Sequence, residues 1–351
     1  MLNSINHRML LLARESRGYS QTEVAAKLRI SQGKLSKAEK GEQSLSTTSI
    51  EQLAKITDYP LSFFYQLSPD APVGHHYYRR KISIPKKIMV QMEAKVKIFR
   101  SNIDQLADSI ELPEYNIPTI KTKNKTPEEI SRIVRYELKI PKGPIENLVN
   151  ILENNGVIIV KTDLFTNKID GLSTVSEKGN RIIFLNMRMP NDRQRFSLAH
   201  ELGHLIMHFD VPSFPEEVEN EADRFASELL MPALEIRNAL RFLNFSKLGD
   251  LKRYWKVSMR SLVQRAKALE IIDKNQYRNF QINFSKKGMT KNEPIPLPEE
   301  QAFIIEEVVR LHRKDLGYSL EELSRVVNLN QDEFRERFIK EKFTKLKIIR
   351  N

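Results

Sequence analysis

Apolar and polar residues follow a helical period over the first part of the chain. The pattern predicts one helix over residues 21–28 and a second over 32–39, and Gly41 ends the second helix. The turn between them covers only residues 29–31, and two short helices joined by so short a turn form a helix-turn-helix. Further helices of an all-α domain over 1–68 are indicated by the capping-box sequences "SQTE" (20–23) and "TSIE" (48–51), by the apolar residues Leu53, Ala54 and Ile56, and by "PLSFF".

A linker and a long helix are predicted next, over residues 69–125. The stretch 68–85 holds three prolines and a glycine, and an apolar stripe then runs from Ile88 to Ile110. Within the linker lies the basic and aromatic cluster "HHYYRRK" (75–81). This cluster either grips a DNA backbone or belongs to a solvated linker whose aromatic rings fold onto the domain.

The pattern changes in the third part, residues 126–285. Helix signals, beginning with an N-cap in "TPEE" (126–129), alternate with three short β-branched stretches. A small sheet with helices is an α+β domain, so we predict a multidomain chain. The expected strands are "VIIVK" (157–161), "IDGLSTV" (169–175) and "RIIFLNM" (181–187). Of the four expected helices, the first ends at Leu138, the second covers "PIENLVNILENNG" (144–156), and the fourth runs from Pro215 to Leu230. The third begins with Asn191 as its N-cap, and Gln194 completes a capping box there.

The last part, residues 286–351, is predicted to be a helical C-terminal region. Its stretch "GYSLEELSRVVNLNQDEF" (317–334) aligns with "GYSQTEVAAKLRISQGKL" (18–35). Either this is a degenerate second copy of the helix-turn-helix, or two helical hairpins share one pattern. Asp332 and Glu333 stand where the first stretch has a glycine and a lysine. Because these acids would repel phosphate, the second stretch is not expected to read DNA.

Composition narrows the function classes. The 351 residues carry a net charge of +12, which favours polyanionic partners. There is no cysteine, so a zinc site must use nitrogen and oxygen ligands. The N-terminus lacks the pattern of a signal peptide, and no apolar run is long enough for a membrane span. A cytoplasmic protein without a membrane partner is therefore expected.

The stretch "SLAHELGHLIMH" (197–208) carries the strongest chemical signal. On a helix, His204 lies one turn beyond His200 and about 40° round the axis, so both imidazoles can reach one ion. Glu201 lies on the flank of that face, where it can act on a bound water as a general base. The pattern predicts a Zn²⁺ site with an open position for that water. The alternative is a solvated helix face without metal.

The third zinc ligand is expected on the following helix. Val218, Ala222, Phe225 and Leu229 form its apolar stripe, and Glu221 lies on the near shoulder of that stripe, so Glu221 is the predicted ligand. A salt bridge is the alternative role for this glutamate. His208, one turn beyond His204, could join the metal shell, bind substrate, stabilise an oxyanion or be a structural histidine.

The stretches "RFSLAHELGHLIMH" and "NEADRFASELLMP" resemble the ImmA/IrrE family of bacterial metallopeptidases, over roughly residues 126–275. The resemblance implies a thermolysin-like site with His200, His204 and Glu221 as zinc ligands and Glu201 as base. It also implies cleavage of DNA-binding repressors in stress or mobile-element responses. Such sites usually carry a supporting aspartate four residues after the glutamate ligand, and after Glu221 that position is Phe225.

Residues 5–67 resemble the Xre/Cro-type helix-turn-helix family, in which the second helix of the motif enters the major groove. The alternative is a protein-interaction or dimerisation module. Domains of this type usually bind paired half-sites of a double-stranded DNA operator, so a homodimer is expected. The predicted DNA contacts are Gln32, Gly33, Lys34, Ser36 and Lys37 on the reading helix, together with Gln21 and Arg8.

These parts together predict a DNA-binding transcriptional regulator with a zinc-dependent endopeptidase. Its expected substrate is a repressor or antitoxin-like protein, aligned by strand addition near Ile182–Leu185. The alternative is a repressor or antitoxin without proteolytic activity. In that case the peptidase-like domain is a sensor or a dimerisation scaffold.

Overall fold

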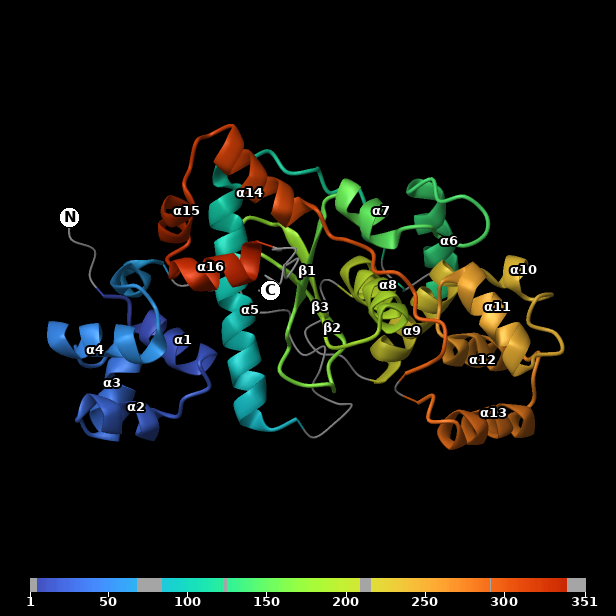
Figure 1. The fold of residues 1–351 in the computed structure, drawn as a ribbon, viewed down its shortest axis with the longest axis horizontal. Helices are drawn as coiled ribbons and strands as arrows, with labels where there is room; N and C mark the ends of the chain where they lie inside the picture. The colour runs from blue at the N-terminus through green and yellow to red at the C-terminus, as the bar shows by residue number, and fades with distance from the viewer. Residues whose placement is uncertain are drawn as a thin grey trace, which may run out of the picture. The chain divides into compact units, whose positions relative to one another are not determined.

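The computed structural model describes residues 5–67, 84–120, 122, 125–208, 216–290 and 292–339 (Figure 1). The basic and aromatic cluster at 75–81 lies outside these residues. Two compact units make up the chain: Met1–Asp70, Met89–Glu111 and Ile304–Asn351 form unit 1, and Ala71–Ile88 and Leu112–Phe303 form unit 2. Among the described helices, none combines the length and the apolar character that a bilayer crossing requires.

Unit 1 is helical, as predicted. The helix-turn-helix has the expected bounds, and a buried ion pair between Arg14 and Glu39, at 2.6 Å, joins the first helix of the unit to the second helix of the motif. The predicted capping box at Thr48 does not form, because the fourth helix begins two residues earlier, with Ser46 as its N-cap. The elements are α1 (His7–Ser16), α2 (Gln21–Leu28), α3 (Gln32–Glu39), α4 (Thr47–Thr57), the 3₁₀ turns η1 (Leu61–Tyr65) and η2 (Ala107–Ser109), α5 (Lys86–Leu106), α14 (Ile304–Lys314), α15 (Leu320–Val326) and α16 (Gln331–Phe338).

Unit 2 confirms the predicted α+β class. Its three strands are β1 (Val157–Thr162), β2 (Gly171–Val175) and β3 (Arg181–Asn186), in the order β1-β3-β2. β3 pairs parallel with β1 and antiparallel with β2. The helices are α6 (Pro127–Glu137), α7 (Leu148–Asn154), α8 (Asn191–Met207), α9 (Glu216–Leu230), α10 (Ala233–Ile236), α11 (Phe245–Trp255), α12 (Met259–Ala268) and α13 (Lys274–Lys286).

Helix α8 is the central element of unit 2, packed against β2, β3 and α9. At Gly203 a Cβ atom would lie 3.0 Å from the Phe225 ring, so glycine allows α8 and α9 to approach closely. The predicted capping box at the start of α8 does not form. Instead, the Asn191 amide donates to the Leu297 carbonyl at 2.8 Å and the Gln194 amide to the Met189 carbonyl at 2.7 Å.

Candidate metal centre and DNA-reading surface

Three metal-ligating side chains of helices α8 and α9 come together in unit 2. The Nε2 atoms of His200 and His204 lie 3.0 Å apart. The Glu219 carboxylate lies 3.7 Å from the first and 3.4 Å from the second. Ligands of a tetrahedral zinc ion are about 3.4 Å apart at normal bond lengths. Two imidazoles and one carboxylate at this spacing therefore fit a zinc ion that keeps one position open.

The structure brings Glu219, and not the predicted Glu221, to the two histidines. It also supplies the supporting aspartate that sequence analysis did not find. Asp223, four residues after Glu219, accepts a hydrogen bond from Nδ1 of His200 at 2.7 Å when that nitrogen carries the proton. This tautomer leaves Nε2 of His200 available to a metal. The signal was present in the sequence, because Glu219 and Asp223 have the glutamate-to-aspartate spacing of thermolysin-like sites.

His208 and Glu221 form a second chain of hydrogen bonds, behind His204. His204 is fully buried, and its Nδ1 lies 3.0 Å from Nδ1 of His208. Nε2 of His208 lies 2.9 Å from the Glu221 carboxylate. If Glu221 accepts the proton of His208 Nε2, His208 Nδ1 can accept the proton of His204 Nδ1. His208 and Glu221 then orient His204 so that its Nε2 atom is directed at the other two potential metal ligands, His200 and Glu219.

Glu201 lies next to the donor group, as we call the three potential metal ligands His200, His204 and Glu219, and a residue of the sheet holds it there. Its side chain is almost fully buried, with a residue exposure of 5%, and the Ser173 hydroxyl of β2 donates to its carboxylate at 2.8 Å. Burial raises the pKa of Glu201 to about 7, against the opposing influence of His200 and of the hydrogen bond from Ser173. A carboxylate with a pKa in this range is suited to proton transfer at neutral pH.

The prediction that a substrate adds as a strand to Ile182–Leu185 is wrong. These residues belong to β3, which is paired on one side with β1 and on the other with β2. A strand paired on both sides has no edge to offer to a substrate. The strand of the sheet that lies against Glu201 is β2, through Ser173.

Of the predicted DNA contacts in unit 1, five lie on α3, Gln21 begins α2 and Arg8 lies in the first turn of α1. Gln32 and Lys37 are exposed, Lys34 and Ser36 are half-buried, and Arg8 is exposed at the start of α1. Gln21 accepts a hydrogen bond from Gln32 at 2.7 Å and donates one to Glu39, also at 2.7 Å. The first of these hydrogen bonds therefore holds together the two glutamines, which begin α2 and α3.

Comparison with known families gives two matches. Residues 10–64 match a helix-turn-helix family. Residues 152–267 match a peptidase family described as IrrE N-terminal-like domain, and this range contains both histidines, Glu201 and Glu219. No curated protein matches the chain.

Proposed function

Because the chain carries a helix-turn-helix domain and an IrrE N-terminal-like peptidase domain, we propose that it is a DNA-binding regulator with a zinc-dependent endopeptidase. The single observation that carries the proposal is the donor group of His200, His204 and Glu219 with Glu201 beside it. The substrate is a repressor or antitoxin-like partner protein, cleaved in a stress, phage or mobile-element response. The chain binds its operator as a homodimer.

In this mechanism His200, His204 and Glu219 would hold a zinc ion, which would polarise the substrate carbonyl and lower the pKa of a water. Glu201 takes the proton of the attacking water and delivers it to the nitrogen of the leaving amine. Ser173 keeps the Glu201 carboxylate in place for both transfers. The experiment that tests this proposal compares the proteomes of cells that produce the wild-type chain or the Glu201→Gln variant.

His208 acts as a positioning residue for His204 in this proposal. We expect His208→Ala to weaken zinc binding by about 10- to 100-fold, the usual effect of losing a hydrogen-bond partner of a metal ligand. Competition with a chromophoric chelator measures this change. His312→Ala is a matched control, because His312 is also a buried histidine but lies in unit 1. Unchanged zinc affinity in His208→Ala would instead favour a role in substrate binding.

The DNA-binding half of the proposal makes a separate prediction for α3. A duplex selected from a random library by the wild-type chain serves as the probe. Substituting Lys34 or Lys37 by alanine should weaken binding and reduce the slope of log K against log salt by about 1 for each phosphate that the chain no longer neutralises. Lys274→Ala, at the start of α13 in unit 2, should leave the slope unchanged. Equal slopes for all variants would favour the interaction-module alternative.

A further inference from the structure

Helices α15 and α16 of unit 1 repeat the geometry of α2 and α3, the N-terminal helix-turn-helix. Gly18 and Gly317 both have positive φ angles, of 71° and 75°. Each precedes a serine that caps the next helix in a capping box. The other landmarks recur at the same offset: Ser20 and Glu23 with Ser319 and Glu322, the left-handed Arg29 with the left-handed Asn328, the N-cap Ser31 with the N-cap Asn330, and α3 with α16, which have equal lengths.

The cores of the two copies correspond as well. The buried Val24, Leu28 and Leu35 of the first copy have buried counterparts at the same offset. These counterparts are Leu323, Val327 and Phe334. A shared backbone and a shared apolar skeleton favour a second copy of the helix-turn-helix over two unrelated hairpins that share one pattern.

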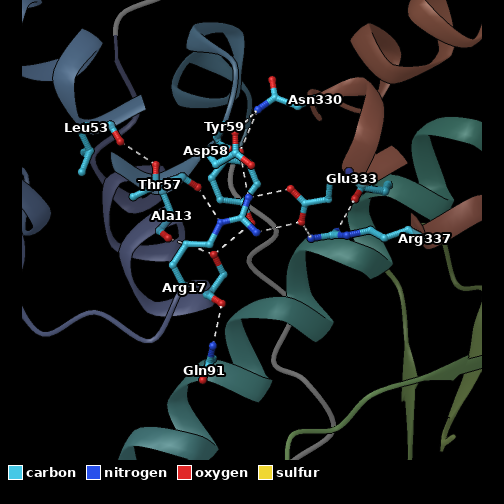
Figure 2. Close-up of polar contacts among 12 residues, drawn as sticks. Ala13, Arg17, Leu53, Thr57, Asp58, Tyr59, Gln91, Asn330, Glu333 and Arg337 are labelled. Atoms are coloured by element: carbon cyan, nitrogen blue, oxygen red, sulfur yellow. Dashed lines mark hydrogen bonds and ion pairs between the residues drawn. The ribbon is translucent and has the colours of Figure 1, made fainter. Parts of the chain in front are cut away.

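The second helix of this copy, α16, faces protein. Figure 2 shows Glu333 between two guanidinium groups, those of Arg17 and Arg337. Arg17 donates to both carboxylate oxygens, at 3.1 and 2.6 Å. The side chains of Glu333 and Arg337 are each only 10% exposed. Position 333 corresponds to Lys34, so the place of a predicted DNA contact is taken here by a docking carboxylate.

On the side of the first copy, the docking surface is built from the ends of α1 and α4. Arg17 also donates to the carbonyls of Thr57, at 2.6 Å, and Asp58, at 2.9 Å. Its guanidinium lies 4.2 Å from the centre of the Tyr59 ring. The Asn330 amide, at the start of α16, donates to the Asp58 carboxylate at 2.7 Å (Figure 2). Contacts with both copies therefore fix the position of the Arg17 side chain.

Helix α5 contacts both copies of the helix-turn-helix within unit 1. The buried Asn102 amide donates to the Val327 carbonyl at 2.8 Å, and Arg337 donates to the Asn102 side-chain oxygen at 3.2 Å. The rings of Phe99 and Phe338 lie 5.1 Å apart. Toward the first copy, the amide of Gln91 donates to the Ser16 carbonyl at 3.3 Å. None of these contacts involves α3, which keeps its exposed face.

We propose that α15 and α16 are a second helix-turn-helix that serves as a docking module for the first. The partner that fits the surface of Arg17, Thr57 and Asp58 is the chain's own helix α16. The module braces the end of α1 and the end of α4 without covering the reading helix, and α16 does not contact DNA. The docking contact is independent of the proposed peptidase, whereas the statement about DNA rests on the proposed DNA binding.

Charge reversal on α16 tests the docking contact. Glu333→Lys restores the residue type of the first copy and places a third cation against Arg17 and Arg337, a repulsive arrangement in a site with little solvent. In the full chain we expect amides of residues 319–338 to exchange hydrogen at least about tenfold faster than in the wild type. Amides of β3 serve as the internal reference and should not change.

Asp332→Lys is the matched control, because it makes the same charge change one residue earlier on the same helix at an exposed position. It should leave exchange in residues 319–338 unchanged. Glu333→Gln provides a milder variant if Glu333→Lys does not fold, and it should show an intermediate increase. Equal exchange in the Glu333 variants and in Asp332→Lys would overturn the docking role.

The DNA statement is tested with the selected duplex and the wild-type chain. Binding should slow amide exchange in residues 32–39 and leave residues 331–338 unaffected. Slower exchange in α16 as well as α3 would show that the second copy also contacts DNA and would overturn its assignment as a docking module only. Absence of protection in both helices, with binding retained, would contradict the proposed reading helix and leave the docking result standing.

Discussion

Replacement of Glu201 by glutamine will slow proteolysis strongly and leave zinc binding intact. Glutamine keeps the size of the side chain and can still accept the hydrogen bond from Ser173, but it cannot take up a proton from water. Loss of a positioned general base lowers a rate by about 10²- to 10⁴-fold. In cells, the partner protein should therefore accumulate in the variant and be depleted in the wild type after induction of the chain. Quantitative proteomics of the two strains measures the difference.

Two controls make this comparison decisive. Elemental analysis of the purified chains should give the same zinc content for both, because Glu201 is not among the three donors. Glu217→Gln removes an exposed carboxylate of α9 and should behave as the wild type. If no protein differs in abundance between the wild type and Glu201→Gln, the alternative of a regulator without proteolytic activity is correct.

Zinc affinity will fall further in Glu219→Ala than in Glu221→Ala. The two residues are two positions apart on α9, but only Glu219 lies within reach of both histidine Nε2 atoms. Removal of a ligand should cost more than the roughly 10- to 100-fold expected for a residue that acts through a ligand. Glu221 acts through His208, so its loss should fall within that lower range.

The same chelator competition measures both variants, and circular dichroism checks that both fold. Asp223→Ala should resemble Glu221→Ala, since Asp223 supports His200 as His208 and Glu221 support His204. A larger loss in Glu221→Ala than in Glu219→Ala would instead restore the ligand expected from the sequence.

Local signals in the sequence were sufficient for much of the fold. The bounds of α2 and α3 follow from capping residues and apolar period, which act within a few positions of each helix end. The pair of histidines and Glu201 is equally local, since one helix carries all three. In these cases the interactions that decide the structure lie inside the element that the pattern describes.

Long-range packing decided what the sequence pattern could not. The choice between Glu219 and Glu221 depends on how α9 is rotated against α8, which is set where Phe225 meets Gly203. The central place of β3 depends on strand order, which no single strand encodes. The missing cap of α8 has the same origin, because the Asn191 side chain is engaged by the distant Leu297.

The contact between Arg17 and Glu333 joins residues that lie 316 positions apart in the sequence. A premature stop codon shortly before Ile304 would keep every residue of the donor group, yet it would strip the support from the far end of α1. Nonsense mutations at such a position would then impair the helix-turn-helix domain, although they lie far from it in the gene.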